Sequence, residues 1–217
     1  MSLKIARLVT GELEANCYLL WQDGAKEAVV VDPGADEDKI RAALGKCGLI
    51  PAALVVTHCH GDHIGALKPL KEAFPEALVC VPEAEKEWLE RPTLNLSYFF
   101  GAAVTGPCAE QLVRDGDTIK AAGLELRAVN VAGHSPGSMA YLVADGATSH
   151  VFCGDILFAN GIGRTDLPGG EGEEVLVANI RQKLFALPEG TLVHPGHGEE
   201  TTIGREKEDN PFCGTEA

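Results

Sequence analysis

A chain of 217 residues can bury one substantial core, and we expect a single domain over residues 1–217. Thirty-two acidic against eighteen basic residues give a formal charge of −14, which repels phosphate backbones and disfavours nucleic acid as a partner. We expect no leader and no membrane partner, because no apolar run approaches the ~18 residues of a membrane span. The seven cysteines form no regular framework, which favours reduced thiols and a cytoplasmic location.

The first half of the chain opens with strands and then alternates strands with helices. Strands are predicted at 5–9, 17–21 and 28–31, the last two separated by the turn signal Gln22-Asp23-Gly24, which indicates an antiparallel opening. There follow a helix at 36–44, a strand at 54–57, a helix from about 65 to 74, a strand at 78–81 and an acidic helix at 83–90. This alternation is typical of a mixed α/β sheet.

Residues 91–110 show no clear periodicity and are predicted to form a loop over a site or a short helix near Tyr98-Phe99-Phe100. These three residues could line a substrate pocket, but because an aromatic run is more often part of a core, they are assigned no role. The second half repeats the plan, with strands at 124–131, 138–143 and 150–153, a helix at 173–187 and a strand at 191–193. The charged tail from Arg205 onward is expected on the surface.

The sequence Thr57-His58-Cys59-His60-Gly61-Asp62-His63 places three imidazoles and a carboxylate on the turn between a buried strand and a helix. If strand geometry continues through the first histidines, His58 and His60 project from the same side and can bind one ion. Gly61 would then let the backbone turn tightly, so that Asp62 and His63 point to a second position close by. The spacing predicts two neighbouring metal positions.

Three later elements also end in residues of the metal-ligand type, each beside glycine. They are His134, Asp155 and His197. Each could instead be a cap or turn residue, since Asp and His often occupy such places. His194 lies three residues before His197, but the proline-glycine context favours His197, and His194 is predicted to end a strand. His150 has no partner motif and is expected on the surface or satisfied within the sheet.

The order His-x-His-x-Asp-His, then His, Asp and His, resembles the metallo-β-lactamase superfamily across nearly the whole chain. The resemblance implies an α/β fold, the αβ/βα sandwich, in which two mixed β-sheets pack face to face with helices on the outer faces and the site lies at one edge between them. It also implies the ligand sets. His58, His60 and His134 would bind the first metal, Asp62, His63 and His197 the second, and Asp155 would bridge both.

Within that superfamily the resemblance narrows to the glyoxalase II group of hydroxyacylglutathione hydrolases, and to its short, single-domain bacterial members. The segments that carry it are Gly154-Asp155-Ile156-Leu157-Phe158, the stretch 161–170, the stretch 195–202 and Asn210-Pro211-Phe212. The longer members have a C-terminal helical domain that helps to hold glutathione, whereas this sequence ends soon after His197. The resemblance therefore implies the reaction class and leaves the thiol carrier open.

The expected chemistry is hydrolysis of a thioester such as S-lactoylglutathione by metal-bound hydroxide. Two divalent ions lower the pKa of a shared water from about 15.7 toward ~7, and the second ion can polarise a carbonyl. A leaving thiolate has a conjugate-acid pKa of roughly 8.5, so no dedicated general acid is required. Asp62 is assigned two roles, as a metal ligand and as the catalytic residue that accepts a hydrogen bond from the hydroxide and orients it.

All seven expected ligands offer nitrogen or oxygen, which suits two divalent metal ions, zinc first, with iron or manganese as alternatives. Asp32, and likewise Thr57, is a candidate to accept the free N–H of a ligand histidine. Arg164 either contacts substrate or pairs with Asp166 to brace a glycine-rich loop. Cys59 and Cys153 are predicted to be buried small residues and not ligands.

Other activities of the superfamily remain as alternatives. A mononuclear iron dioxygenase acting on glutathione persulfide also carries a Gly-Arg-Thr-Asp stretch like residues 163–166, and it would leave the second metal position empty. A lactonase needs the same hydroxide. A secreted β-lactamase is disfavoured by the expected lack of a leader, a nuclease by the charge of −14, and a non-catalytic binding module by the intact ligand set.

Overall fold

The computed structural model describes residues 2–215. Its strands are β1 (Leu3–Thr10), β2 (Ala15–Gln22), β3 (Glu27–Val31), β4 (Ile50–Val55), β5 (Leu78–Pro82), β6 (Gln111–Val113), β7 (Thr118–Ala121), β8 (Leu124–Asn130), β9 (Met139–Asp145), β10 (Thr148–Gly154), β11 (Leu157–Phe158), β12 (Gly161–Ile162), β13 (Leu192–Pro195) and β14 (Thr201–Thr202). Its helices are α1 (Glu37–Cys47), α2 (Gly61–Ile64), α3 (Leu67–Ala73), η1 (Glu83–Glu90), η2 (Ser97–Phe100), α4 (Glu173–Asn179), η3 (Ile180–Leu184) and α5 (Ile203–Asp209).

The first sheet has the strand order β1-β2-β3-β4-β5-β6. Its first three strands are antiparallel because short turns join them, and this confirms the predicted antiparallel opening. From β3 onward the neighbours are parallel, since α1 and then α2 and α3 return the chain to the same edge before the next strand begins. The parallel part brings the carboxyl ends of β3, β4 and β5 to one edge.

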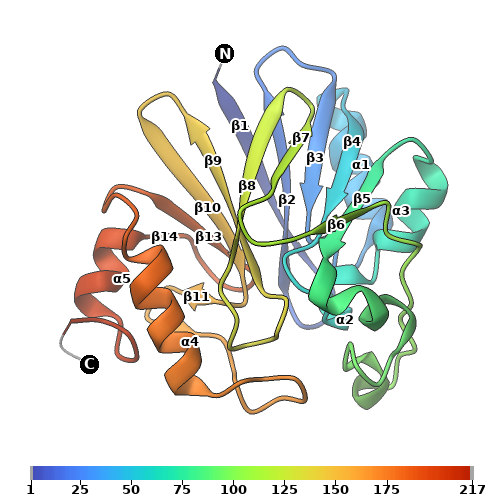
Figure 1. The fold of residues 1–217 in the computed structure, drawn as a ribbon. Coiled ribbons are helices and arrows are strands. Elements are labelled where there is room, and N and C mark those ends of the chain that lie inside the picture. The colour runs from blue at the N-terminus through green and yellow to red at the C-terminus, as the bar shows by residue number, and fades with distance from the viewer. Residues whose placement is uncertain (1, 216–217) are drawn as a thin grey trace.

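The second sheet has the order β14-β13-β10-β9-β8-β7, and β11 and β12 form a small separate ribbon. Meander turns make β7, β8, β9 and β10 antiparallel, whereas β13 returns parallel to β10 after the crossover through α4 and η3. Figure 1 shows the two sheets side by side, with α1 and α3 beyond the first and α4 and α5 beyond the second.

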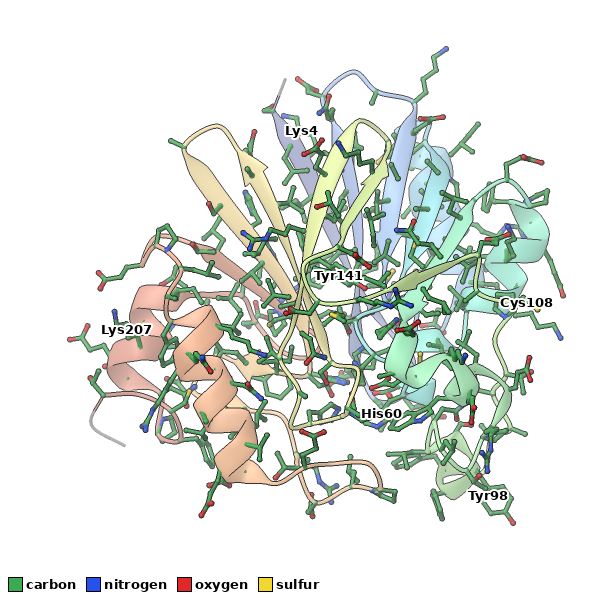
Figure 2. The ribbon with its side chains drawn as sticks, in the orientation of Figure 1. Lys4, His60, Tyr98, Cys108, Tyr141 and Lys207 are labelled. Carbon is green, nitrogen blue, oxygen red and sulfur yellow. The ribbon has the colours of Figure 1, made fainter. Side chains whose placement is uncertain are left out.

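Three apolar clusters hold these layers together. One lies between the sheets and joins β2, β3 and β4 to β8, β9 and β10, with Leu20, Val29 and Tyr141 among its fully buried members. The other two lie between each sheet and its outer helices. The αβ/βα sandwich predicted from the resemblance is therefore confirmed. The Tyr141 hydroxyl crosses the central layer and donates to the Val56 carbonyl at 2.9 Å (Figure 2).

Several local predictions need correction. The acidic segment 83–90 is a 3₁₀ helix, and the helix expected over 173–187 is α4 followed by the π-helical turn η3. The tail is not simply a charged surface segment, because α5 packs on the second sheet and Glu206 is buried, where it accepts from the Thr201 hydroxyl at 2.6 Å. The run Tyr98-Phe99-Phe100 is not core, since its side chains are about two-thirds exposed. No helix within 2–215 is long and apolar enough to cross a membrane.

Candidate metal centre

The ends of strands from both sheets meet at one edge of the sandwich, and each carries residues of the metal-ligand type. The run from His58 to His63 follows β4 and passes into α2, His134 lies in the loop after β8, Asp155 follows β10, and His197 follows β13. His60 lies at this edge, between the two halves of the molecule (Figure 2). The topology therefore brings together all seven residues that the sequence marked as ligands, although they span 140 positions of the chain.

Three of the histidines form the first cluster. The Nε2 atom of His134 lies 3.2 Å from Nε2 of His58 and 3.0 Å from Nδ1 of His60. These three atoms belong to a group whose ligand atoms all lie within 4.8 Å of one another. Ligand atoms around a tetrahedral ion with bonds of 2.0–2.1 Å stand about 3.3 Å apart, so the observed spacing suits a small divalent cation.

The second cluster is formed by Asp62, His63 and His197. Nε2 of His197 lies 3.2 Å from a carboxylate oxygen of Asp62, and Nε2 of His63 lies 3.7 Å from the same oxygen. The helix α2 begins at Gly61, so Asp62 and His63 project from its first turn.

Asp155 lies between the two clusters. Its Oδ2 atom is 3.8 Å from Nε2 of His134 and 3.6 Å from Nε2 of His197, while its Oδ1 atom is 3.4 Å from Nε2 of His63. Nε2 of His63 and Oδ1 of Asp155 are both buried without a hydrogen-bond partner. Because buried polar atoms are rarely left unpaired, a pair of cations, one in each cluster, is the occupant that these atoms suit.

The electrostatics of the two clusters differ. Burial and the neighbouring imidazoles lower the pKa of His58, and burial with His134 lowers the pKa of His60 to about 3, so both rings are neutral and ready to coordinate. Burial also lowers the pKa of His134. In the second cluster burial opposes protonation of His63, but Asp62 and Asp155 outweigh it and raise the pKa of His63.

Each carboxylate of the site stays ionised. Burial would raise the pKa of Asp155 and of Asp62, but the positive charge of His63 outweighs burial and lowers both pKa values. Burial opposes protonation of His197, whereas its hydrogen bond to Asp62 favours protonation. The net effect is a pKa of His197 above its ordinary value. The clusters thus hold two carboxylates and five imidazoles that face one another, an arrangement that favours binding of divalent cations.

Asp32 and Thr57 orient two of these histidines from behind. Asp32 accepts from the Thr57 backbone N–H and hydroxyl, both at 2.7 Å, and from Nδ1 of His63 at 3.1 Å. The Nδ1 atom of His58 donates to the Thr57 hydroxyl oxygen at 3.1 Å. Both rings are thereby turned with Nε2 toward the site. Gly154 has a φ of +51°, and a Cβ there would lie 2.2 Å from the Thr57 hydroxyl oxygen, which explains glycine at the end of β10.

The loop that carries Arg164 orients the third histidine of the first cluster. Nδ1 of His134 donates to the Arg164 carbonyl at 2.7 Å, which again turns Nε2 inward. The Arg164 side chain makes two 3.0 Å hydrogen bonds to the Asp166 carboxylate, and both residues are exposed. Two roles were predicted for Arg164, contact with substrate and bracing of its loop by pairing with Asp166. The observed ion pair corresponds to bracing, and Arg164 also lines the cavity above the site.

Glu85 was missed by sequence reasoning. Its side chain is fully buried, and its two oxygens accept from the backbone N–H of Cys59 at 2.6 Å and of Gly137 at 2.7 Å. It therefore joins the loop of His58 and His60 to the loop of His134. Four glutamates occur between positions 83 and 90, and no local signal marks Glu85 among them.

The remaining candidates lie outside the clusters. Cys59 and Cys153 are buried in the core, as predicted. His150 is satisfied within the second sheet by a 3.0 Å contact between its Nδ1 atom and Nε2 of His194. His194, on β13, donates through Nδ1 to Glu200 at 2.9 Å and belongs to none of the metal-ligand clusters found among the described residues.

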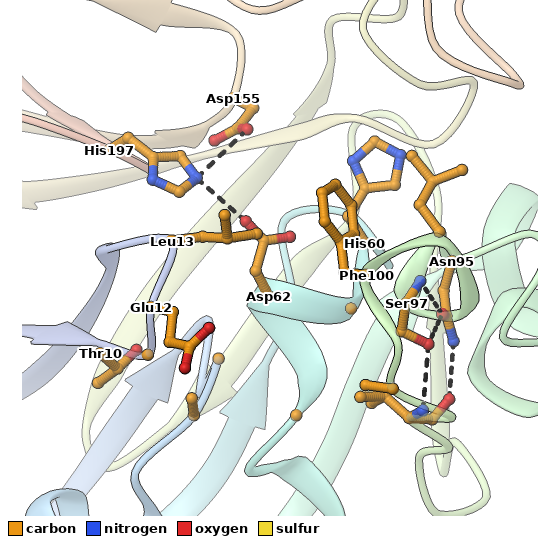
Figure 3. A pocket seen from close by; sticks show the side chains of 18 of the residues that line it. Thr10, Glu12, Leu13, His60, Asp62, Asn95, Ser97, Phe100, Asp155 and His197 are labelled. Carbon is orange, nitrogen blue, oxygen red and sulfur yellow. Dashed lines mark hydrogen bonds and ion pairs between the residues drawn. The ribbon is translucent and has the colours of Figure 1, made fainter.

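A cavity of about 670 Å³ opens over the clusters. Its floor includes His60, Asp62, Asp155 and His197, as Figure 3 shows. The segment 91–104 forms one wall, so the predicted loop over a site and the short helix are both present. This wall is tied to the metal-binding turn, because the Gly61 N–H donates to the Asn95 carbonyl at 2.8 Å. A Cβ on Gly61 would lie 2.7 Å from Ser97, so close approach, and not a positive φ, requires glycine here.

A family model described as the metallo-beta-lactamase superfamily matches residues 10–197, which include every residue of the two clusters. The chain belongs to this superfamily. Its members typically bind two metal ions, in agreement with the two clusters, and they include metal-dependent hydrolases. The fold is accordingly the metallo-β-lactamase fold.

Two curated relatives match over almost the whole chain. "Probable metallo-hydrolase YqgX" of Bacillus subtilis is 40% identical over 211 residues, covering 97% of each chain. "Hydroxyacylglutathione hydrolase GloC" of Haemophilus influenzae is 32% identical over 205 residues, covering 94% of this chain and 95% of the relative.

Solved structures agree with the fold. The BLEG-1 B3 metallo-beta-lactamase superposes with a TM-score of 0.91 at 38% identity, covering 97% of this chain and 99% of the other. TTHA1623 in a di-iron-bound form superposes with a TM-score of 0.82 at 35% identity, covering 95% of this chain and 99% of the other. ETHE1 from Myxococcus xanthus superposes with a TM-score of 0.78 at 29% identity, covering 97% of this chain and 84% of the other.

Proposed function

We propose that the protein is a dinuclear metal-dependent hydrolase that cleaves a thioester, such as S-lactoylglutathione, to a carboxylic acid and a thiol. The observation that carries the proposal is the pair of clusters joined by Asp155, with Nε2 of His63 and Oδ1 of Asp155 buried and unpaired between them. The relative named hydroxyacylglutathione hydrolase supports the substrate class. We further propose zinc as the metal, because the set of imidazoles and carboxylates suits it.

In this proposal His58, His60 and His134 would hold one ion and Asp62, His63 and His197 the other, with Asp155 available to both clusters. When bound, the ions supply hydroxide at neutral pH and polarise the thioester carbonyl. The Asp62 carboxylate faces the cavity, and its lowered pKa keeps it an acceptor, so it can orient the attacking O–H group. The oxygen of water joins the acyl carbon, the C–S bond breaks, and the thiolate leaves with the electron pair and takes a proton.

The thioester is favoured by what surrounds the site. No titratable side chain other than the cluster residues and Arg164, Glu12, Asp36 and Glu37 lines the described part of the cavity. None of these is placed as a buried general acid beside the clusters, and a thiolate needs no such acid because its conjugate-acid pKa is roughly 8.5. We place the enzyme in the cytoplasm, with a small molecule as its partner and neither nucleic acid nor a membrane.

A second candidate is a mononuclear iron dioxygenase acting on glutathione persulfide. The observation in its favour is the structural likeness to ETHE1 together with the Gly-Arg-Thr-Asp stretch, in which the Arg164 carbonyl accepts from His134. A lactonase or β-lactam hydrolase is a third, since the site chemistry is shared and one similar structure is called a B3 metallo-beta-lactamase.

The test is elemental analysis of the purified protein beside thiol release from S-lactoylglutathione. We expect close to two metals per chain and turnover that Asp62→Ala and His197→Ala abolish. His150→Gln, a histidine outside both clusters, is the matched control and should retain turnover. A single iron with no thiol release, and oxygen uptake with glutathione persulfide, would replace the hydrolase by the dioxygenase. Two metals without thiol release from this substrate would direct the search to other thioesters and to lactones or β-lactams.

A further inference from the structure

The cavity over the metal clusters has an acidic side and an apolar side. Glu12, on the turn between β1 and β2, and Asp36 and Glu37, at the start of α1, bring three carboxylates to one side. The two elements are tied together because Asp36 accepts from the Gly11 N–H at 3.0 Å. Figure 3 shows Glu12 and Leu13 on this side, next to Asp62. We name Glu12, Asp36 and Glu37 the acidic rim.

The acidic rim has little positive charge to balance it. Among the described residues that line the cavity, Arg164 is the one arginine or lysine, and its guanidinium is already paired with Asp166. Lys39 lies on the same helix as Glu37, but its Nζ atom donates to the Val9 carbonyl at 2.6 Å, and the residue does not line the cavity. An incoming carboxylate therefore meets like charge at the entrance, where no lysine or arginine that lines the described cavity is free to pair with it, and the positive charge proposed for the metal ions lies below, at the cavity floor.

The opposite wall is apolar and formed in advance. Leu96, Phe100 and Val104 line it, and Figure 3 shows Phe100 close to His60. Phe100 is 67% exposed and lines the cavity, so its ring is available to contact a bound molecule. The Asn95 side chain donates to the carbonyls of Trp88 at 2.9 Å and Val104 at 3.0 Å, which fixes the segment.

We propose, on the basis of the thioesterase function above, that the acidic rim selects thioesters whose thiol carrier has no net negative charge. An anionic carrier such as glutathione would bring its carboxylates toward Glu12 and Glu37, where repulsion opposes binding, whereas an uncharged or cationic carrier meets no such opposition. The apolar wall at Phe100 accepts the apolar part of the substrate. Selection is thus made largely by repulsion of the wrong carrier.

The experiment compares S-lactoylglutathione with its diethyl ester, which has the same acyl group and peptide but lacks the two carboxylates. Thiol release reports cleavage of the thioester bond alone in both substrates. We expect kcat/KM to be about tenfold higher for the diethyl ester at low ionic strength, because each of three rim charges contributes about twofold at separations near 8 Å in water. The difference should lie mainly in KM and shrink at ~0.5 M salt.

Variants test whether the acidic rim causes the difference in kcat/KM between the two substrates. The double variant Glu12→Gln/Glu37→Gln should narrow the ratio between the two substrates by about fourfold. Asp38→Asn is the matched control, because Asp38 lies on the same helix, its side chain is 92% exposed and it does not line the cavity. It should leave the ratio unchanged.

The outcomes separate this inference from the proposed function. If S-lactoylglutathione is cleaved as well as its ester, or if the double variant and Asp38→Asn change the ratio equally, the acidic rim does not select the carrier and the thioesterase assignment stands. If neither substrate releases thiol from protein with two metals bound, the thioesterase assignment fails and this inference fails with it.

Discussion

Glu85 is a buried carboxylate that joins two loops of the metal centre. Its oxygens accept from the N–H groups of Cys59 and Gly137, one on each side of the first cluster. Burial raises the pKa of Glu85, so keeping it here costs free energy that the two backbone N–H groups offset only in part. A residue kept at such a cost has a positioning role, since each oxygen fixes a loop that carries histidines of the first cluster.

Replacing Glu85 by alanine should therefore loosen the first cluster. Two buried N–H groups lose their acceptors, and we expect the metal-free protein to lose about 2–4 kcal/mol of unfolding free energy. Metal affinity should fall together with activity, because His60 and His134 lose their common support. Urea denaturation and metal titration measure both effects.

The control for this prediction is Glu87→Ala on the same 3₁₀ helix, where the side chain is exposed and pairs with Arg91 at 3.7 Å. It should change stability by no more than about 0.5 kcal/mol. Glu85→Gln can restore one acceptor and should fall between wild type and Glu85→Ala. An alanine variant with unchanged metal affinity would refute the positioning role.

Proton binding at the second cluster gives a prediction on pH. The carboxylates around His63 raise its pKa well above 6.5, and the hydrogen bond to Asp62 raises the pKa of His197, so in the metal-free protein both rings keep their protons to higher pH than a free imidazole does. A cation must displace these protons, and metal affinity should fall as pH decreases, by about tenfold per pH unit for each proton displaced. Release of protons into a weakly buffered solution on zinc addition, measured from pH 6 to 8, checks this.

The same groups determine how the stability of the metal-free protein changes with pH. In the metal-free protein the protonated form of His63 stabilises the fold, and this contribution is fully present below the unfolded pKa of 6.5 and is lost as pH rises through the higher folded value. Zinc, once bound, replaces the proton as the partner of the carboxylates. Metal affinity that is independent of pH over this range would contradict the assignment of His63 and His197 to the second ion.

At the residue scale, the candidate site was predictable where its chemistry is local in the chain. His58, His60, Asp62 and His63 stand within six positions, and Asp32 was predicted as an acceptor because it lies at a strand end before the motif strand. Glu85 was not predictable, since its role depends on Gly137, which lies 52 positions further along the chain. Tyr98, Phe99 and Phe100 were favoured as core but are exposed, and Phe100 lines the cavity, because hydrophobicity alone does not distinguish a core side chain from an exposed one.

Among the elements, the wall segment 91–104 depends on one side chain. Asn95 is fully buried, and besides its two donated hydrogen bonds its Oδ1 atom accepts from the Ser97 N–H at 3.1 Å and hydroxyl at 2.7 Å. The Ser97 hydroxyl oxygen in turn accepts from the Val104 N–H at 3.1 Å. These bonds hold an irregular segment in one conformation above the first cluster, without help from a sheet or a long helix.

Asn95→Ala should release this segment while the two sheets stay folded. Four hydrogen bonds are lost, and we expect KM for a thioester to rise about five- to tenfold while kcat falls less, because the wall contacts substrate and not the reacting atoms. Limited proteolysis should cut the variant faster between 91 and 104. Tyr98→Ala serves as the control, since Tyr98 is 64% exposed and does not line the cavity. Equal KM values for the two variants would show that Asn95 does not organise the wall.

The sequence predicted the long strands but not the shortest ones. Long strands such as β2 and β8 were predicted, because β2 contains a continuous apolar run and the buried residues of β8 recur at the strand period. The strands β11, β12 and β14 have two residues each and exist only through pairing, so no local pattern marks them. The helix type of η1 and η3 was also missed, since the periods of 3₁₀, α and π turns differ too little over five to eight residues.

For the whole molecule, the metal centre lies where the two halves of the sandwich meet. His58, His60, Asp62 and His63 come from the first half, whereas His134, Asp155 and His197 come from the second. Hydrogen bonds also cross this boundary near the site, among them those from the Gly137 N–H to Glu85 and from the Tyr141 hydroxyl to the Val56 carbonyl. The Asn16 N–H donates to the Gly196 carbonyl at 2.7 Å, and the Tyr18 hydroxyl donates to the Pro195 carbonyl at 2.8 Å. Strand and helix patterns predicted each half, but the face-to-face packing was expected only from the family resemblance, because contacts between distant strands leave no periodic signal.

Metal ions bound at this boundary should therefore stabilise the entire fold. Protein treated with a chelator should unfold at a lower temperature, and zinc should restore stability in a concentration-dependent way, by about 4 kcal/mol at a free concentration one thousand times Kd. His134→Ala and His197→Ala each remove a ligand from the second half and should reduce the zinc-dependent rise in Tm. His150→Gln, within the second sheet but outside both clusters, should keep the full rise. A rise of equal size in all three variants would mean that zinc binds elsewhere, whereas its loss in the two ligand variants alone would show that the ions join the halves.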